Sequence, residues 1–185
     1  MTTVATIRRA RPTDVAGLAE VLVDCVAGGA SIGFMLPYGH DQATAFWQDV
    51  LGRDDRIVLV AEDGDGEVVG TAQVVFPGFD NQPHRVEVAK VLVHRRARRQ
   101  GVGDALMAAV EATTLAAGRT LLVLDTASPD AERLYRRRGW VRVGEIPRFA
   151  LWPDGGFVAT TIFYKDLSAE PASSTAPSVA EPASR

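Results

Sequence analysis

The spacing of apolar residues changes between the period of a strand and the period of a helix several times along the chain. Apolar or alternating β-branched runs predict strands, which cover residues 4–9, 56–61, 68–75, 84–93, 121–126, 141–147 and 157–165. Apolar residues three and four apart predict helices, which begin near residues 14, 41, 101 and 129. Leu121 to Thr126 is the most apolar short run, so we expect it to be a fully buried strand.

The stretch from Val86 to Met107 combines a strand, a basic loop and a helix. Its loop holds a cluster of arginines followed by two glycines, namely Arg95, Arg96, Arg98, Arg99, Gly101 and Gly103. The first N–H groups of a helix lack intrahelical partners, and residues without Cβ let an anion approach the backbone. Arginine side chains add charge suited to phosphate oxygens. The stretch therefore predicts a pyrophosphate site, although a solvated basic loop would show the same residues.

Two common phosphate-binding motifs do not fit this loop. A P-loop requires G-x-x-x-x-G-K-[ST], and a dinucleotide fingerprint requires a third small residue where Leu106 stands. Arg98 to Gly103 reads R-x-x-G-x-G instead, which resembles the acetyl-coenzyme A loop of the GCN5-related N-acetyltransferases (GNAT). A second motif of that superfamily, A-E-R-L-Y-R-R-R-G-W, runs from Ala131 to Trp140.

The resemblance extends over the order of expected elements from Val4 to Leu167. The segments G-G-A-S-I-G-F-M, R-V-E-V-A-K-V-L-V, L-D-T-A-S and R-V-G-E-I-P look, more narrowly, like the tabtoxin-resistance type. The resemblance implies a mixed α/β fold with a mostly antiparallel sheet of six to seven strands and about four helices. It also implies acetyl-CoA as co-substrate, a small-molecule amine as acceptor, and direct transfer in a ternary complex.

The family motifs carry over to particular residues of this chain. The positions that match its acetyl-CoA site are Val91, Leu92, Val93, Arg98, Arg99, Gln100, Gly101, Val102, Gly103, Asp104, Ser128, Ala131, Tyr135 and Arg138. Ser128 is a departure, because many members have Asn there; its hydroxyl can still cap a helix or contact the pantetheine.

Length and composition limit the number of domains, the partners and the compartment that are expected for this chain. A chain of 185 residues with 46% hydrophobic residues suits one domain, expected over residues 1–167, and residues 168–185 read as a disordered Pro/Ala/Ser-rich tail. The net charge of -3 argues against a nucleic-acid partner, and no apolar run is long enough for a membrane span. A single cysteine, Cys25, and the absence of an apolar leader favour a cytoplasmic protein.

The histidines have no metal-ligand spacing, so no metal is expected. A homodimer through residues 157–164 is also predicted.

Three polar side chains are candidates for the chemistry. Acetylation needs a neutral amine, so a carboxylate must accept a proton directly or through water. Glu87, on the strand face opposite Val88, is the first choice as base, and Asp125 is expected to hold the ammonium. By the family motif, Tyr135 is the general acid for the departing thiolate. Each residue also has a structural interpretation: Glu87 pairs with Arg85 or Lys90, Asp125 caps the next helix, and Tyr135 is a core aromatic.

The glycine-punctuated loop from Gly28 to Tyr38 presents apolar side chains that either the core or a ligand must cover. We expect Ser31 and Phe34 to contact the acceptor, together with Glu87 and Asp125. In the helix that follows, Ala45, Phe46 and Val50 are expected to face inward, and Trp47 either shares that face or lines the ligand cleft. Peptide acetylation and a non-catalytic acetyl-CoA-binding domain remain the alternative functions.

Overall fold

The computed structural model describes residues 5–168, so all of the predicted tail except Ser168 lies outside them. Within this range the strands are β1 (Thr6–Arg9), β2 (Arg56–Glu62), β3 (Val68–Val75), β4 (Arg85–Val93), β5 (Leu121–Thr126), β6 (Val141–Leu151) and β7 (Phe157–Asp166). The helices are α1 (Val15–Ala27), α2 (His40–Leu51), α3 (Val102–Ala116) and α4 (Pro129–Arg137), with 3-10 turns at Pro12–Asp14 and Arg95–Ala97. The expected mixed fold of about seven strands and four helices is confirmed.

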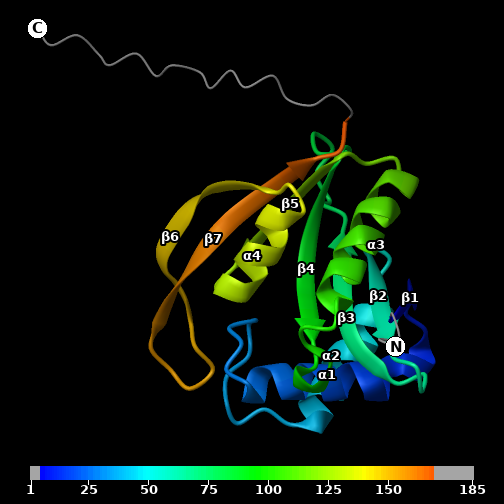
Figure 1. Ribbon diagram of the computed structural model, residues 1–185, viewed down its shortest axis with the longest axis vertical. Helices are drawn as coiled ribbons and strands as arrows, with labels where there is room; N and C mark the ends of the chain where they lie inside the picture. Colours follow the sequence, from blue (N-terminus) through cyan, green and yellow to red (C-terminus); the bar gives the residue numbers. More distant parts are fainter. Residues whose placement is uncertain (1–4, 169–185) are drawn as a thin grey trace, which may run out of the picture.

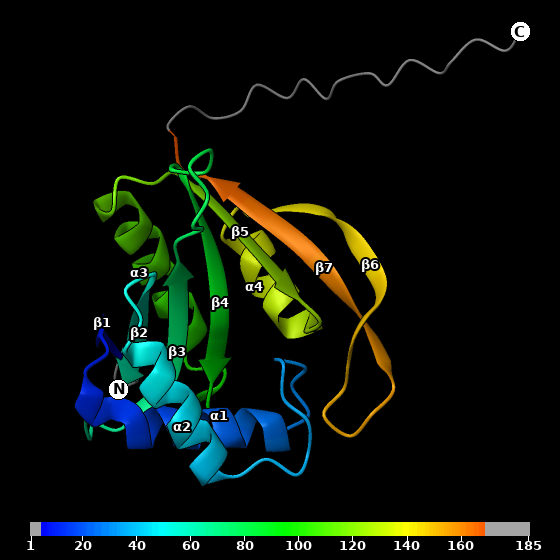
Figure 2. The same ribbon diagram turned by 180° about the vertical axis from the view of Figure 1, so that it is seen from behind.

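The strands form one sheet in the order β1-β2-β3-β4-β5-β7-β6, and β4 and β5 are its parallel pair. These two strands are paired only from Arg85 opposite Leu121 to Glu87 opposite Val123. Beyond that point they diverge toward the end of the molecule where α1 lies (Figures 1 and 2). The divergence leaves backbone groups of β4 from Val88 onward without a strand partner on that side.

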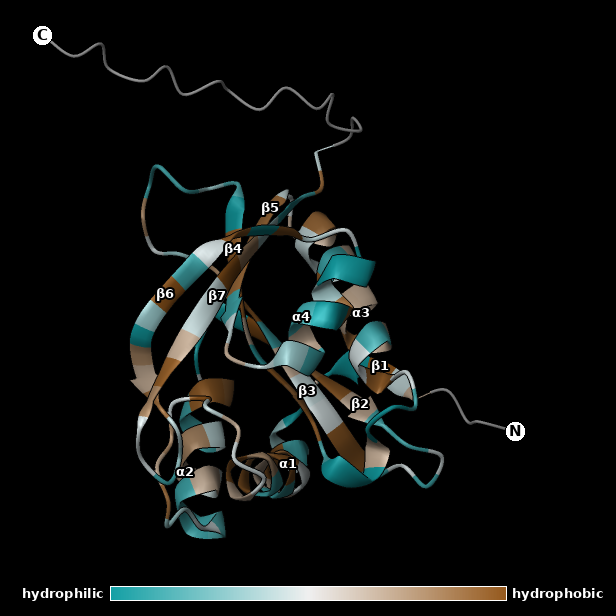
Figure 3. Cartoon of the chain, turned by 60° about the vertical axis from the view of Figure 1, so that its left-hand side comes forward, coloured by the Kyte–Doolittle hydropathy of each residue, from teal (hydrophilic) through white to brown (hydrophobic). Residues whose placement is uncertain are grey.

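Two apolar clusters hold helices on opposite faces of the sheet. One cluster joins α3 and α4 to the sheet through residues such as Met107, Leu122 and Tyr135. The other joins α1 and α2 to it around the fully buried Trp47. Figure 3 shows the hydrophobic colours gathered along the strands and on the inner sides of the helices.

The side-chain pattern differs from prediction at two elements. Within α2 the buried positions are Ala43, Trp47 and Val50, whereas Ala45 is exposed. Trp47 therefore belongs to the core. The expectation that β5 is fully buried was wrong, because Asp125 is exposed and only alternate residues face the core. The β5 segment beyond its pairing with β4 borders open space, which explains the difference.

A β-bulge interrupts β4. Thr71 pairs with Leu92 and Gln73 with Ala89, so two residues of β4, Lys90 and Val91, oppose one residue of β3. Lys90 has φ of 49°, in the left-handed region. Simple alternation places Lys90 on the same face as the buried Val88, but a bulge of this kind re-aims a side chain. Its ammonium consequently reaches the aromatic ring of Phe34, on the α1–α2 side.

Candidate active site

A cleft of about 860 Å³ opens where β4 and β5 diverge. Its walls come from the bulged half of β4, the loop after α1, the start of α3, the β5–α4 junction and the β6–β7 hairpin. Most residues predicted to contact acetyl-CoA line it: Val91, Leu92, Val93, Arg98, Arg99, Gly101, Val102, Gly103, Asp104, Ser128, Ala131 and Tyr135. The structure thus brings the two sequence motifs together around one cavity.

The start of α3 has the geometry of an anion site. Gly101, its N-cap, has φ of 83°, a conformation that favours glycine. A Cβ at Gly103 would lie 3.2 Å from Cδ2 of Leu134, so this glycine permits α3 and α4 to approach closely. Arg98 donates its Nε hydrogen to the Val93 carbonyl at 3.1 Å. The loop is therefore fixed by local conformation and packing before any ligand arrives.

A buried carboxylate on α1 anchors the beginning of this loop. Asp24 accepts hydrogen bonds from the backbone N–H and from Nε of Arg95, both at 2.8 Å. Burial alone would raise the pKa of Asp24, but these bonds and the neighbouring positive charges bring it below its usual value. No local pattern predicts this pair, because its members are 71 positions apart.

Two of the predicted acetyl-CoA residues lie outside the cleft lining. Gln100 donates to the Arg96 carbonyl at 3.0 Å and is exposed. Arg138 pairs with Asp104 at 3.1 Å and with Glu111 at 3.2 Å. Arg138 thereby ties the end of α4 to α3, so the structure gives it a supporting position rather than a contact with the cavity.

Asp125 and Tyr135 both line the cleft. Asp125 Oδ2 accepts a hydrogen bond from Thr160 Oγ1 at 2.7 Å, and the other carboxylate oxygen has no hydrogen-bond partner among the described residues. Tyr135 is buried between Trp140 and Phe163, with ring centroids 5.7 and 5.8 Å away. Burial raises the pKa of the Tyr135 phenol well above its usual value, and the charge of Asp125 adds to this. The phenol therefore keeps its proton at neutral pH, in the same cavity as Asp125.

Glu87 does not line this cleft. Its carboxylate is exposed and pairs with Arg85, 2.6 Å away, as in its structural interpretation. Glu87 lies on the predicted strand face, but at the last position where β4 and β5 are still joined. The structure therefore does not bring it together with Asp125 and Tyr135.

The loop after α1 closes one end of the cleft. Ser31 lines the cavity and donates its hydroxyl hydrogen to the Leu151 carbonyl at 2.9 Å, and the Leu36 N–H donates to the Pro153 carbonyl at 2.8 Å. Phe34 packs behind the lining against Tyr38 and Phe46. The loop and the β6–β7 hairpin are thus joined by hydrogen bonds at one end of the cavity, and Figure 2 shows their ribbons beside one another.

The model of the acetyltransferase (GNAT) family matches residues 29–140, a range that includes the arginine loop, α3 and all of α4. The chain belongs to this family. An L-methionine sulfoximine/L-methionine sulfone acetyltransferase from Pseudomonas aeruginosa is 29% identical over 164 residues, which is 83% of this chain and 92% of that protein. These matches establish the family and leave the acceptor open.

Solved structures of GNAT proteins share the fold. A phosphinothricin acetyltransferase from Sinorhizobium meliloti in complex with acetyl-CoA has a TM-score of 0.77 at 22% identity, covering 97% of this chain and 98% of that one. A ribosomal-protein-alanine N-acetyltransferase from Brucella melitensis has a TM-score of 0.75 at 26% identity, covering 88% and 99%. The GNAT fold therefore accommodates acceptors as different as a small molecule and a protein.

Several residues of this GNAT cleft escaped the sequence analysis. They are Lys90 on the bulge, Arg133 and Arg137 on α4, Thr160 on β7, and Phe149 and Trp152 near the β6–β7 turn. The one signal in the sequence was a lysine in the more apolar half of β4, and simple alternation placed it on the face of Val88. Arg133 and Arg137 lie within the second motif but at positions that were not carried over from the family, and Phe149, Trp152 and Thr160 lie outside both motifs.

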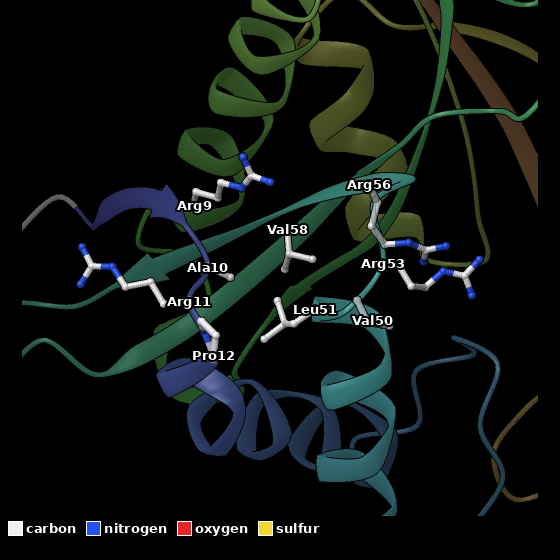
Figure 4. A pocket seen from close by; sticks show the side chains of 9 residues that line it. All are labelled: Arg9, Ala10, Arg11, Pro12, Val50, Leu51, Arg53, Arg56 and Val58. Carbon is white, nitrogen blue, oxygen red and sulfur yellow. The ribbon is translucent and has the colours of Figure 1, made fainter.

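A second, smaller cavity of about 90 Å³ lies between β1, the end of α2 and β2 (Figure 4). Four arginines line it, but Arg53 and Arg56 are each bound by Asp55. The guanidinium groups of Arg9 and Arg11 point away from one another (Figure 4). Among residues 5–168 no group of three His, Cys, Asp or Glu side chains is arranged to hold a metal ion, and no helix is long and apolar enough to span a membrane.

Proposed function

We propose that the protein transfers the acetyl group of acetyl-CoA to a primary amine of a small molecule, such as an antibiotic, a toxin or an amino-acid-like compound. The observation that carries this proposal is the single cleft that joins an anion site at the start of α3 to Asp125 and Tyr135. Pyrophosphate oxygens would lie against the first N–H groups of α3 and beside Arg98 and Arg99. The opening between β4 and β5 would hold the pantetheine arm.

Two polar side chains of the cleft, Asp125 and Tyr135, both take part in the proton transfers. Asp125 holds the acceptor ammonium and receives its proton, directly or through water. The neutral nitrogen then forms a bond to the thioester carbonyl carbon, and the carbon–sulfur bond breaks. Tyr135 donates its phenolic proton to the departing sulfur, and the second proton that the nitrogen gives up as the amide forms passes through water and restores the phenol. Glu87 takes no part in these proton transfers because it pairs with Arg85 outside the cleft.

Backbone N–H groups in β4 between Val91 and Val93 are suited to the carbonyl oxygen of the thioester. They lie in the part of β4 that has no β5 partner, so they are available to polarise this oxygen. This role needs no side chain, which is why apolar residues serve here.

The hydrogen-bonded loops at one end of the cleft favour a small acceptor over a peptide. Ser31 and Leu36 tie the loop after α1 to Leu151 and Pro153, and a peptide would have to separate them. The similarity to the tabtoxin-resistance type and to the Pseudomonas relative agrees with this choice. A non-catalytic acetyl-CoA-binding domain would not require a buried tyrosine and a carboxylate in the same cavity.

The test is a screen of small primary amines with purified protein and acetyl-CoA, which measures the release of free thiol and the mass of the product. The proposal predicts amine-dependent thiol release with one N-acetylated product per thiol. Reactions without amine correct for hydrolysis, and peptides with free N-termini test the alternative acceptor. Turnover of peptides but of no small amine, or of neither, would contradict the proposal.

A further inference from the structure

Lys90 carries a charge that no residue in the described range 5–168 neutralises. The chain has two lysines, and Lys165 is fully engaged, with Glu111 Oε1 3.0 Å from Nζ and a hydrogen bond donated to the Arg138 carbonyl. Within the described range the Lys90 ammonium has neither a carboxylate within ion-pair distance nor a hydrogen-bond acceptor, although its side chain is half-buried in the cleft wall. A desolvated charge without a partner is costly, so such a lysine is uncommon outside binding sites.

The backbone is bent so that this side chain reaches the cleft. Lys90 has the positive φ of the bulge, a conformation that costs a residue with a Cβ free energy. Its Nζ lies 5.5 Å from the centroid of Phe34, over the ring. Phe34 is itself fixed by Tyr38 and Phe46, at 4.6 and 5.1 Å. The ammonium therefore has a defined position beside the loop that closes the acceptor end.

Asp125 lies in the same cavity but not within ion-pair distance of Lys90. Burial lowers the pKa of the Lys90 ammonium, the charge of Asp125 raises it, and that of Arg56 lowers it. Asp125 is thus near enough for its charge to affect the Lys90 ammonium, although the two side chains do not form an ion pair. Two opposite charges held apart across a cavity match a ligand that carries both an ammonium and an anion.

We propose that Lys90 binds a carboxylate of the acceptor, so that the acceptor is an α-amino acid or a close analogue held by its ammonium at Asp125 and its carboxylate at Lys90. This inference rests on the proposed acetyltransferase function and narrows its substrate class. Lys90 is then a specificity-determining residue.

The experiment compares L-α-amino acids, L-methionine sulfone among them, with their own carboxamides as acceptors. Thiol release gives kcat/KM for each acceptor with the wild type, Lys90→Met, Lys90→Arg and Arg9→Gln. Each acceptor is compared with itself across enzymes, so the intrinsic difference in amine reactivity cancels. Arg9→Gln removes one positive charge from the exposed end of β1 and controls for net charge. Calorimetry with acetyl-CoA checks that each variant keeps its co-substrate site.

Loss of a hydrogen-bonded charge pair predicts that Lys90→Met lowers kcat/KM for the amino acids by ~10-fold to ~100-fold. The carboxamides should change by less than about 3-fold, Lys90→Arg should retain most of the activity on the acids, and Arg9→Gln should behave as wild type. Equal losses for acid and amide, or no loss for either, would overturn the inference while the proposed function stands. Turnover of amines without a carboxylate, but not of amino acids, would also overturn the inference and leave the proposed function standing. The absence of any amine-dependent thiol release would refute the proposed function itself.

If Lys90→Met does not fold, inhibition of the wild type decides the question. Carboxylic acids that lack the amino group should compete with the acceptor, and their carboxamides should compete at least ~10-fold more weakly. Equal inhibition by both would overturn the inference.

Discussion

Replacing Tyr135 by Phe should separate its role in packing from its role in the reaction. The Tyr135 hydroxyl makes no hydrogen bond to any residue of the described range, and its ring packs against Trp140 and Phe163. The phenylalanine ring preserves these contacts. The substitution should therefore change the free energy of unfolding by less than about 1 kcal/mol, which for a chain of this length is a shift in Tm of no more than ~4 °C.

The effect on turnover should be much larger. A general acid contributes a large factor only while the thiolate leaves, so kcat should fall by ~10-fold to ~1000-fold, or about 1.4–4 kcal/mol of transition-state stabilisation. The affinity for acetyl-CoA should change little. Because the pKa of the phenol is raised, the hydroxyl stays protonated, so the loss should be the same from about pH 6 to about pH 10.

The assay is thiol release at saturating acceptor across this pH range, with calorimetry for acetyl-CoA and thermal unfolding of each variant. Tyr164→Phe is the matched control, since Tyr164 lies on β7 with an exposed side chain and should show no loss. Wild-type kcat in Tyr135→Phe would refute the assignment. A fall in kcat that disappears at high pH, or one that accompanies a large loss of stability, would refute the reasoning from burial.

Three further predictions concern other parts of the molecule. Asp125→Asn should raise the KM for the amine by ~10-fold or more, because it removes the charge that holds the ammonium, and an unchanged KM would exclude that role. Arg8 donates two hydrogen bonds to Asp14, at 2.7 and 2.8 Å, and lowers the pKa of Asp14. The stabilisation of the fold by this ion pair is complete above the unfolded Asp pKa of ~4 and is lost as the pH falls through the lower pKa of the folded protein. The free energy of unfolding of Asp14→Asn should therefore depend less on pH between about 5 and 2 than that of the wild type. Identical pH profiles for the two proteins would contradict this role of Asp14. The predicted homodimer would cover the exposed Phe157 on β7, 59% accessible, and a monomer mass by light scattering at high concentration would exclude it.

The sequence was sufficient for the parts of the fold that follow from local rules. Period and glycine placement located the strands, the helices and the loop at Gly101, and Ser128 accepts the Ala131 N–H at 3.3 Å as the predicted cap. These features depend on residues close together in the chain, so a pattern can reveal them.

The features that the sequence could not predict depend on the register between strands and on contacts between distant elements. Alternation placed Glu87 on the correct face, but the point where β4 and β5 part depends on their pairing, which ends at Glu87 itself. The bulge at Lys90 likewise follows from the register between β3 and β4, and the contact of Asp24 with Arg95 joins separate elements. Each of these errors or omissions concerns a tertiary relation rather than a local preference.

Calorimetric titration of acetyl-CoA into the wild type and Gly101→Asp tests whether the cleft at the start of α3 holds this co-substrate. At Gly101 an aspartate would adopt a strained φ and place a negative charge where the phosphates are expected. Gly66→Asp is the matched control, because Gly66 also has positive φ but lies in the exposed turn between β2 and β3. We expect one site per chain in the wild type and in Gly66→Asp, and loss of binding in Gly101→Asp. Equal affinity in all three proteins, or no binding by the wild type, would contradict this expectation.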